Sequence, residues 1–247
     1  FLTLPIVAIF IDTSPAELVR SLGEPDALEA LWLSLKTSLA ALAIIVVVGT
    51  PAAYLLATRE FRGRSVVMTL IELPLVLPPA VAGIALLACF GPEGLCGSAL
   101  EDAGIALVLQ TAGVIVALTF VAAPFYLRQA QEAFAAVDRN LLDAARTLGS
   151  SEAGAFARVA VPCAGQGITA GMALAWGRAL GEFGATLMFA GSFPGITQTV
   201  PLAIFSRFSS DFTSALALSA VLVIVSAALL LSVKLLGRSP LLGGGQA

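Results

Sequence analysis

Long apolar runs that contain no charged side chain dominate this chain. Five of them cover residues 37–58, 73–92, 103–127, 159–177 and 212–233. About 20 helical residues cross ~30 Å of hydrocarbon, so each run is close to or above the length of a membrane span. A shorter apolar stretch opens the chain, and with it the pattern predicts six helical spans near residues 1–11, 34–58, 65–90, 104–127, 163–190 and 213–235. We therefore expect an all-α polytopic membrane protein.

The composition strengthens this prediction and excludes several classes of function. Of the 247 residues, 58% are hydrophobic and 12% are charged, whereas soluble domains carry about 25% charged residues. The absence of histidine excludes Ser-His-Asp catalysis, His-ligated metals and a His proton relay. Cys89, Cys96 and Cys163 form no metal-binding pattern, and a Cys89–Cys96 bridge and free thiols both stay open.

The distribution of basic residues predicts an orientation. Lys and Arg near span ends are retained on the cytoplasmic side, and nine of the thirteen basic residues fall on one side of the predicted spans. They are Arg59, Arg62, Arg64, Arg128, Arg139, Arg146, Arg158, Lys234 and Arg238. Both termini are therefore predicted to be cytoplasmic. We expect residues 1–30 to hold the outer part of a truncated first span, not a signal peptide, and an external loop. A membrane domain follows at 31–238, with a flexible cytoplasmic tail at 239–247.

A cytoplasmic loop of 33 residues separates Arg128 from Pro162, far more than is needed to join two spans. Asp138 is placed to cap a helix over 139–148, and Gly149 to end it with a positive φ. Ser151 is placed to cap a second short helix that includes Phe156 and ends by about Val161, before Pro162. The apolar stripe of this loop, 138–161, is too small to form a core of its own. The loop is predicted either to dock on a partner or to lie on lipid headgroups.

The same loop resembles the EAA signature of binding-protein-dependent ABC importer permeases. Matching positions are Asp143, Ala144, Ala145, Gly149 and Pro162, with Asp in place of the usual Glu and with Val159 and Val161 in place of Ile and Leu. The resemblance covers roughly residues 30–236. It implies a type I ABC importer permease fold in which this segment, between spans 4 and 5, is the coupling helix that sits in a groove of the ATPase. The implied ATPase-coupling residues are Asp143, Ala144, Ala145, Gly149, Ser151, Phe156 and Pro162.

Three further stretches look like the molybdate/tungstate permease. They are RALGEFGATLMFAG at 178–191, LPLVLPPAVAGIALL at 73–87 and TQTVPLAIF at 197–205. Sulfate permeases share the Gly-Glu-Phe-Gly core at 181–184, but the continuation ATLMFAG favours molybdate. A sulfate/thiosulfate permease is the alternative.

The resemblance also implies partners and a location. Two copies of the chain are expected to form a homodimer in the lipid of a prokaryotic cytoplasmic membrane. Two cytoplasmic ABC ATPases would supply the ATP and Mg sites, and a periplasmic or lipid-anchored protein would deliver the oxyanion. No nucleic acid or cofactor is expected for this chain. It has no G-x-x-x-x-G-K-[ST] phosphate loop and is therefore not expected to be an enzyme.

A proton-coupled secondary transporter using Glu72 and Glu182 is the alternative from another class, and it leaves the long loop without a role.

Ionisable residues inside predicted spans are functional-site candidates. Arg178 and Glu182 are four residues apart, so on one helix they share a face and can pair. They either neutralise each other to fix helix position or form part of a gate. Glu72 is interpreted as an interfacial group. Prolines at 74, 78 and 79 predict a break in the third span. The candidate pathway and gate residues are Arg178, Glu182, Gly181, Phe183, Thr186, Pro78 and Pro79.

Overall fold

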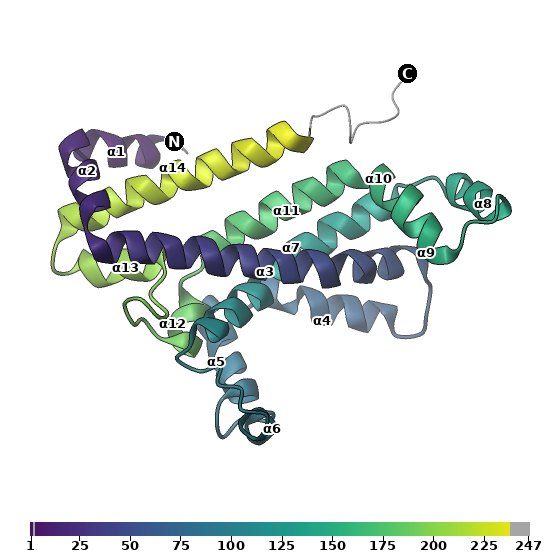
Figure 1. The fold of residues 1–247 in the computed structure, drawn as a ribbon, viewed down its shortest axis with the longest axis horizontal. Coiled ribbons are helices and arrows are strands. Elements are labelled where there is room, and N and C mark those ends of the chain that lie inside the picture. The colour runs from purple at the N-terminus through teal and green to yellow at the C-terminus, as the bar shows by residue number, and fades with distance from the viewer. Residues whose placement is uncertain (2, 238–247) are drawn as a thin grey trace. The chain divides into compact units, whose positions relative to one another are not determined.

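Helices account for all the regular structure of the described residues, which are residue 1 and residues 3–237 of a computed structural model (Figure 1). Three helices are long and apolar enough to cross a membrane by length and composition. They are α3 (Pro25–Thr58), α7 (Thr111–Ala135) and α14 (Phe212–Gly237). The predicted all-α class with membrane-spanning segments is confirmed.

Two pairs of shorter helices add up to two further spans if each pair is counted as one. The first pair is α4 (Arg64–Val76) and α5 (Pro79–Phe90), separated at the predicted proline break, although Pro74 itself lies inside α4. The second pair is the helical segment Glu152–Cys163 and α11 (Gly165–Leu180), bent by 74°. The first apolar stretch forms α1 (Leu4–Asp12), whose nine residues are fewer than a span needs. The count of six spans stays a prediction.

The chain forms two compact units. The first comprises Phe1–Ala41, Leu77–Val121 and Arg178–Ala228. Besides parts of longer helices it contains α1, α2 (Pro15–Gly23), α5, α6 (Gly97–Asp102), α12 (Gly184–Ala190) and α13 (Val200–Phe208). One of its cores joins α5 and α12 through buried Ala82, Leu86, Ala185 and Phe189. Gly83 makes this approach possible, because a Cβ there would lie 2.7 Å from the carbonyl oxygen of Ala185.

A second core in the same unit joins α3, α13 and α14. Ala27, Val200 and Leu218 are fully buried in it. The hydroxyl of Ser34 accepts a hydrogen bond of 2.8 Å from the backbone N–H of Val200, which has no partner in the first turn of α13. This bond fixes where α13 begins against α3.

Of the described residues, the other unit comprises Leu42–Val76, Ala122–Gly177 and those from Leu229 to Gly237. Close helix contacts in it depend on small residues: a Cβ on Gly167 would lie 2.3 Å from that of Ala133. Thr50 on α3 and Tyr126 on α7 share a hydrogen bond of 2.5 Å between their hydroxyls. The hydroxyl of Tyr126 is thereby partnered even though the residue is fully buried.

Several helices differ in extent from the spans predicted over them. The helix over the span predicted at 34–58 begins earlier, because Pro25 is well suited to the first turn of α3. The helix over the span predicted at 104–127 begins at Thr111, after irregular backbone in which Gly104 and Leu109 have positive φ. It continues to Ala135 because QAQEAFA is rich in helix-forming residues. The three cysteines are free thiols, and the predicted tail at 239–247 lies outside the described residues.

Candidate functional site

The loop 138–161 begins with a capped helix, as predicted. Asp138 Oδ1 accepts a hydrogen bond of 2.9 Å from the N–H of Asn140, and α8 runs from Arg139 to Thr147. Gly149 has φ +87°, and its N–H donates to the carbonyl oxygen of Arg146. The N–H of Ser150 donates to the carbonyl of Ala145 at 3.0 Å. These two bonds form a Schellman motif, which requires a left-handed residue at Gly149.

The second half of the loop begins with the predicted cap and ends differently. Ser151 Oγ accepts from the N–H of Gly154 at 3.1 Å, and α9 spans Glu152–Ala155. A π-helical turn at Phe156–Ala160 and a short helix, α10 (Val161–Cys163), then continue the chain. The expectation that this helix ends before Pro162 is wrong. The N–H of Val161 bonds to the carbonyl of Phe156 in the wider turn, and Pro162 sits at the start of α10, where no N–H is needed.

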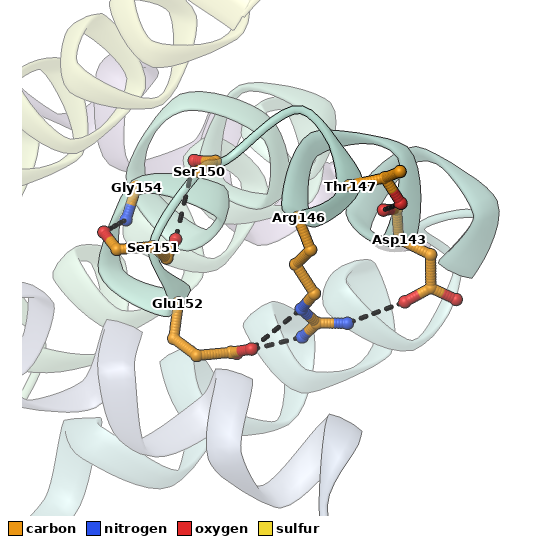
Figure 2. A network of polar contacts seen from close by, with 7 residues as sticks. All are labelled: Asp143, Arg146, Thr147, Ser150, Ser151, Glu152 and Gly154. Atoms are coloured by element: carbon orange, nitrogen blue, oxygen red, sulfur yellow. Dashed lines mark hydrogen bonds and ion pairs between the residues drawn. The ribbon is translucent and has the colours of Figure 1, made fainter.

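Arg146 connects the two halves of the loop (Figure 2). Its guanidinium contacts Asp143 Oδ1 at 2.8 Å on α8 and Glu152 Oε1 at 2.8 Å on α9. The hydrogen bonds that Arg146 donates, above all the one to Glu152 and then the one to Asp143, raise the pKa of Arg146. The hydrogen bond from Arg146 lowers the pKa of Glu152. We call Asp143, Arg146 and Glu152 the Arg146 network. It holds α8 and α9 at a defined angle across the Gly149 turn.

One side of the loop is left uncovered in this chain. Leu148 is 89% exposed and Leu141 is 49% exposed, whereas Leu142 is buried. Asp143 and Ala144 are also exposed. Leu142 thus anchors α8, and the remaining apolar side chains present a small surface with a carboxylate beside it.

Phe156 has a different position from the other predicted coupling residues. Its ring lies 4.8 Å from that of Tyr54 and 6.1 Å from that of Phe134, measured between centroids. Tyr54 lies on α3 and Phe134 on α7. Phe156 therefore attaches the loop to the ends of two long helices instead of contributing to the uncovered side.

Arg178 and Glu182 form the predicted ion pair, with 2.5 Å between Nη2 and Oε2. They do not lie on one helix, because α11 ends at Leu180 and α12 begins at Gly184. The continuous span predicted at 163–190 is thus wrong. Glu182 Oε1 accepts a hydrogen bond of 2.8 Å from the N–H of Ala185, so the carboxylate also caps α12. With 2% of its surface exposed, Glu182 is a buried charge: Oε1 has the hydrogen bond from Ala185, whereas Oε2 has the ion pair with Arg178 but no hydrogen bond.

The other pathway candidates surround this break. Gly181 is exposed, and the ring of Phe183 lies 4.9 Å from that of Phe205. Thr186 is fully buried on α12. Pro78 precedes α5, and Pro79 begins it. A Cβ on Gly184 would lie 2.8 Å from Cβ of Pro79, so the first residue of α12 lies against the first residue of α5.

Sequence reasoning missed three functional candidates. Arg146 was used only as one of the basic residues that predict orientation, and Glu152 was not singled out, although Asp143 and Arg146 have the spacing of a helical ion pair. Gly83 has no local signal, because its role depends on α12 lying against α5.

Comparison with known proteins gives consistent matches. Residues 45–239 match the family described as binding-protein-dependent transport system inner membrane component. The molybdenum transport system permease protein ModB of Mycobacterium tuberculosis is 42% identical over 243 residues, covering 98% of this chain and 90% of that protein. The molybdate/tungstate transport system permease protein WtpB of Pyrococcus abyssi is 36% identical over 212 residues, covering 84% and 79%.

A probable sulfate transport system permease protein, cysT of Chlorokybus atmophyticus, is 33% identical over 238 residues, covering 94% and 83%. Among solved structures, a crystal structure of a bacterial ABC transporter involved in the import of the acidic polysaccharide alginate superposes with a TM-score of 0.76. It has 16% sequence identity and covers 96% of this chain and 90% of that chain. At that identity the likeness concerns the fold.

Proposed function

We propose that this chain, which belongs to the family of binding-protein-dependent transport system inner membrane components, is the permease subunit of an ATP-driven importer of molybdate or tungstate. The observation that carries the proposal is 42% identity to a molybdenum permease over 98% of the chain. A sulfate permease matches at 33%. Sulfate is therefore the second candidate substrate.

The chain is a membrane subunit without its own ATPase site. Its family implies an ATPase and a substrate-binding protein as partners. We infer that the ATPase docks on the uncovered side of loop 138–161, where Leu148, Asp143 and Ala144 are exposed. Movement of the ATPase would reach the membrane helices through Phe156, which packs against α3 and α7. The rigid turn at Gly149 and the Arg146 network would transmit that movement instead of absorbing it.

For the membrane part we infer a homodimer in which the break at 181–183 lies along the pathway. A buried ion pair beside an interrupted helix combines a fixed charge with backbone that can move. Because Arg178 and Glu182 cancel, the site would not trap a divalent oxyanion. Both termini would be cytoplasmic, and the binding protein, periplasmic or lipid-anchored, would dock on the opposite side.

Uptake measurements test this function. The permease would be reconstituted in vesicles with and without its ATPase, and the binding protein would be added outside with labelled molybdate. Uptake should require ATP and the ATPase, and unlabelled tungstate should compete better than sulfate. Uptake by the permease alone under a proton gradient would overturn the proposal in favour of a secondary transporter. Stronger competition by sulfate would change the substrate and leave the ATP-driven mechanism in place.

A further inference from the structure

A cavity of ≈ 700 Å³ lies in the second unit, between the end of α3 and the loop formed by α8 and α9. Its lining residues are Pro51, Tyr54, Leu55, Thr58, Arg59, Arg139, Leu142, Asp143, Arg146, Glu152, Ala153 and Phe156. The ATPase-docking surface shares only Asp143 with this cavity, whose lining includes neither Leu148 nor Ala144, and the ion pair at Arg178 lies outside it. It is large enough to hold a small polar group together with part of an apolar chain.

Two of the three arginines that line the cavity, Arg59 and Arg139, are not paired with its carboxylates. Arg146 is held by both acids, Asp143 and Glu152. Arg59 and Arg139 are exposed, and the described residues give neither of them an ion pair or a side-chain hydrogen bond. Arg59 acts on Glu152 only through its longer-range field. With three arginines against two carboxylates, the cavity has an excess positive charge suited to an anion.

The rest of the lining indicates what kind of anion fits. Pro51, Leu55 and Phe156 give the cavity an apolar wall beside the arginines. Leu55 lies in the last turn of α3, one of the helices long and apolar enough to span a membrane, and is 53% exposed. A free inorganic anion would leave this wall in contact with water. A molecule with a phosphate head and an apolar tail would cover both parts.

We propose that this cavity binds the headgroup of an anionic phospholipid. Arg59 and Arg139 contact its phosphate, and an acyl chain follows Leu55 along α3 toward the hydrocarbon. Basic pockets at the cytoplasmic ends of membrane helices commonly bind such headgroups. The inference rests on the proposed function for the cytoplasmic location of the loop. A bound lipid would support α8 from the membrane side and make coupling to the ATPase depend on anionic lipid.

Lipid retention by the purified complex tests the inference. The permease with its ATPase would be purified in mild detergent, exchanged with phosphatidylglycerol or phosphatidylcholine, and examined by native mass spectrometry. Wild-type protein should retain phosphatidylglycerol. Arg59→Gln with Arg139→Gln should retain it about 30-fold more weakly, which is ~2 kcal/mol at 1.4 kcal/mol per factor of ten. The matched control is Arg62→Gln with Arg158→Gln, which removes two exposed arginines outside the cavity and should retain lipid as the wild type does.

The outcomes separate this inference from the proposed function. Equal retention by both double variants would overturn the lipid site. Displacement of the lipid by millimolar inorganic phosphate would overturn it too and assign the arginines to a free anion. If retention follows the prediction but the complex transports no oxyanion, the proposed function fails and the lipid site stands. If uptake is normal while retention is unchanged in every variant, only the lipid site fails.

Discussion

Gly149 and Gly23 have the same open surroundings, since a Cβ at either position would meet no atom within 4 Å. Only Gly149 has positive φ, at +87°. An L-residue in that region costs roughly 1–2 kcal/mol. Backbone conformation alone, without any steric contact, therefore explains why glycine is needed at the turn between α8 and α9.

The first prediction concerns this turn. Gly149→Val should leave membrane insertion intact but lower substrate-stimulated ATP hydrolysis, because the Schellman motif is lost. Gly149→Asn should reduce substrate-stimulated ATP hydrolysis less, since Asn tolerates the left-handed region. Gly23→Val is the control and should behave as the wild type. The measurement is the ATPase rate of the reconstituted complex, and full stimulation in Gly149→Val would contradict the proposed coupling role.

The second prediction concerns Arg178 and Glu182. Arg178→Gln should strongly lower expression, because an unpaired buried carboxylate costs about 3–5 kcal/mol. Glu182→Gln keeps an oxygen that can accept from Ala185, whereas Glu182→Ala loses both the cap and the ion pair and should fold worse. The double variant Arg178→Gln with Glu182→Gln should recover expression.

Transport by that double variant then separates the two roles of the pair. Recovered expression with leaking or uncoupled uptake would support a gate. Recovery of expression, ATPase rate and uptake together would leave the pair with only a structural role.

Local chemistry explains which residues of the loop could be predicted from sequence. Asp138, Gly149 and Ser151 act on backbone groups two or three residues away, so their roles are visible in the chain order. Glu182 could be predicted as a partner of Arg178 but not as a cap. That second role depends on the helix ending at Leu180, and RALGEFGATL has no proline to mark the end.

The approach of α5 and α12 is set by glycines at the scale of elements. Gly83 and Gly184 would each bring a Cβ within 3.0 Å of the opposite helix. Neither role was predicted, because a glycine inside an apolar run is compatible with many packings. Pro78 and Pro79 could be predicted to break the span, since proline acts on its own helix.

The third prediction tests this packing. Gly83→Ala should destabilise the protein by about 1–3 kcal/mol, because Ala185 and Met188 must move to admit the methyl group. The control, Gly177→Ala, places a methyl group 4.0 Å from Leu230 and should be neutral or slightly stabilising. Apparent melting temperatures in detergent measure both. A melting temperature for Gly83→Ala equal to that of Gly177→Ala would contradict the close approach.

The fourth prediction concerns the Arg146 network. Arg146 lowers the pKa of Glu152 in the folded loop. The stabilisation of the loop by the ionised Glu152 carboxylate is therefore complete above the ordinary pKa of Glu. It is lost only as the pH falls through the lower pKa of the folded loop. Hydrogen exchange at Ser150 to Gly154, corrected for intrinsic rates, should therefore be equally protected at pH 7 and pH 5. Arg146→Gln should lose protection at both pH values, whereas Arg158→Gln should keep it, because Arg158 forms no ion pair with any described residue. Unchanged protection in Arg146→Gln would show that the turn alone holds the loop.

Across the whole molecule, the class of protein was predictable because it depends on composition and on the length of apolar runs. The positions at which the helices end were less predictable. Helices α3 and α7 extend past their apolar runs into polar segments that form helix equally well. Hydropathy indicates where the hydrocarbon of the membrane ends. A helix ends where its backbone N–H and C=O groups take hydrogen-bond partners outside the helix.

The fifth prediction concerns assembly. Cys89, Cys96 and Cys163 would first be replaced by Ser, and a single cysteine introduced at Gly181, which is exposed. A thiol-reactive cross-linker in membranes should capture a permease homodimer even without the ATPase. A cysteine at Gly23 instead is the control and should cross-link poorly. Monomers alone, in vesicles that still transport, would exclude the homodimer.

The π-helical turn at Phe156–Ala160 has a consequence for insertions and deletions. Such a turn holds one residue more than an α-helical turn, so removing one residue within it should leave the faces of the flanking helices unchanged. Removing one residue from α11 would rotate every later side chain by about 100°. Pro162 opposes the shorter form, because its ring would clash with a carbonyl in a tight α-helix. We therefore expect a one-residue deletion in this turn to be tolerated only together with Pro162→Ala. In evolution, the extra residue of the π-helical turn and the proline at 162 should be gained or lost together.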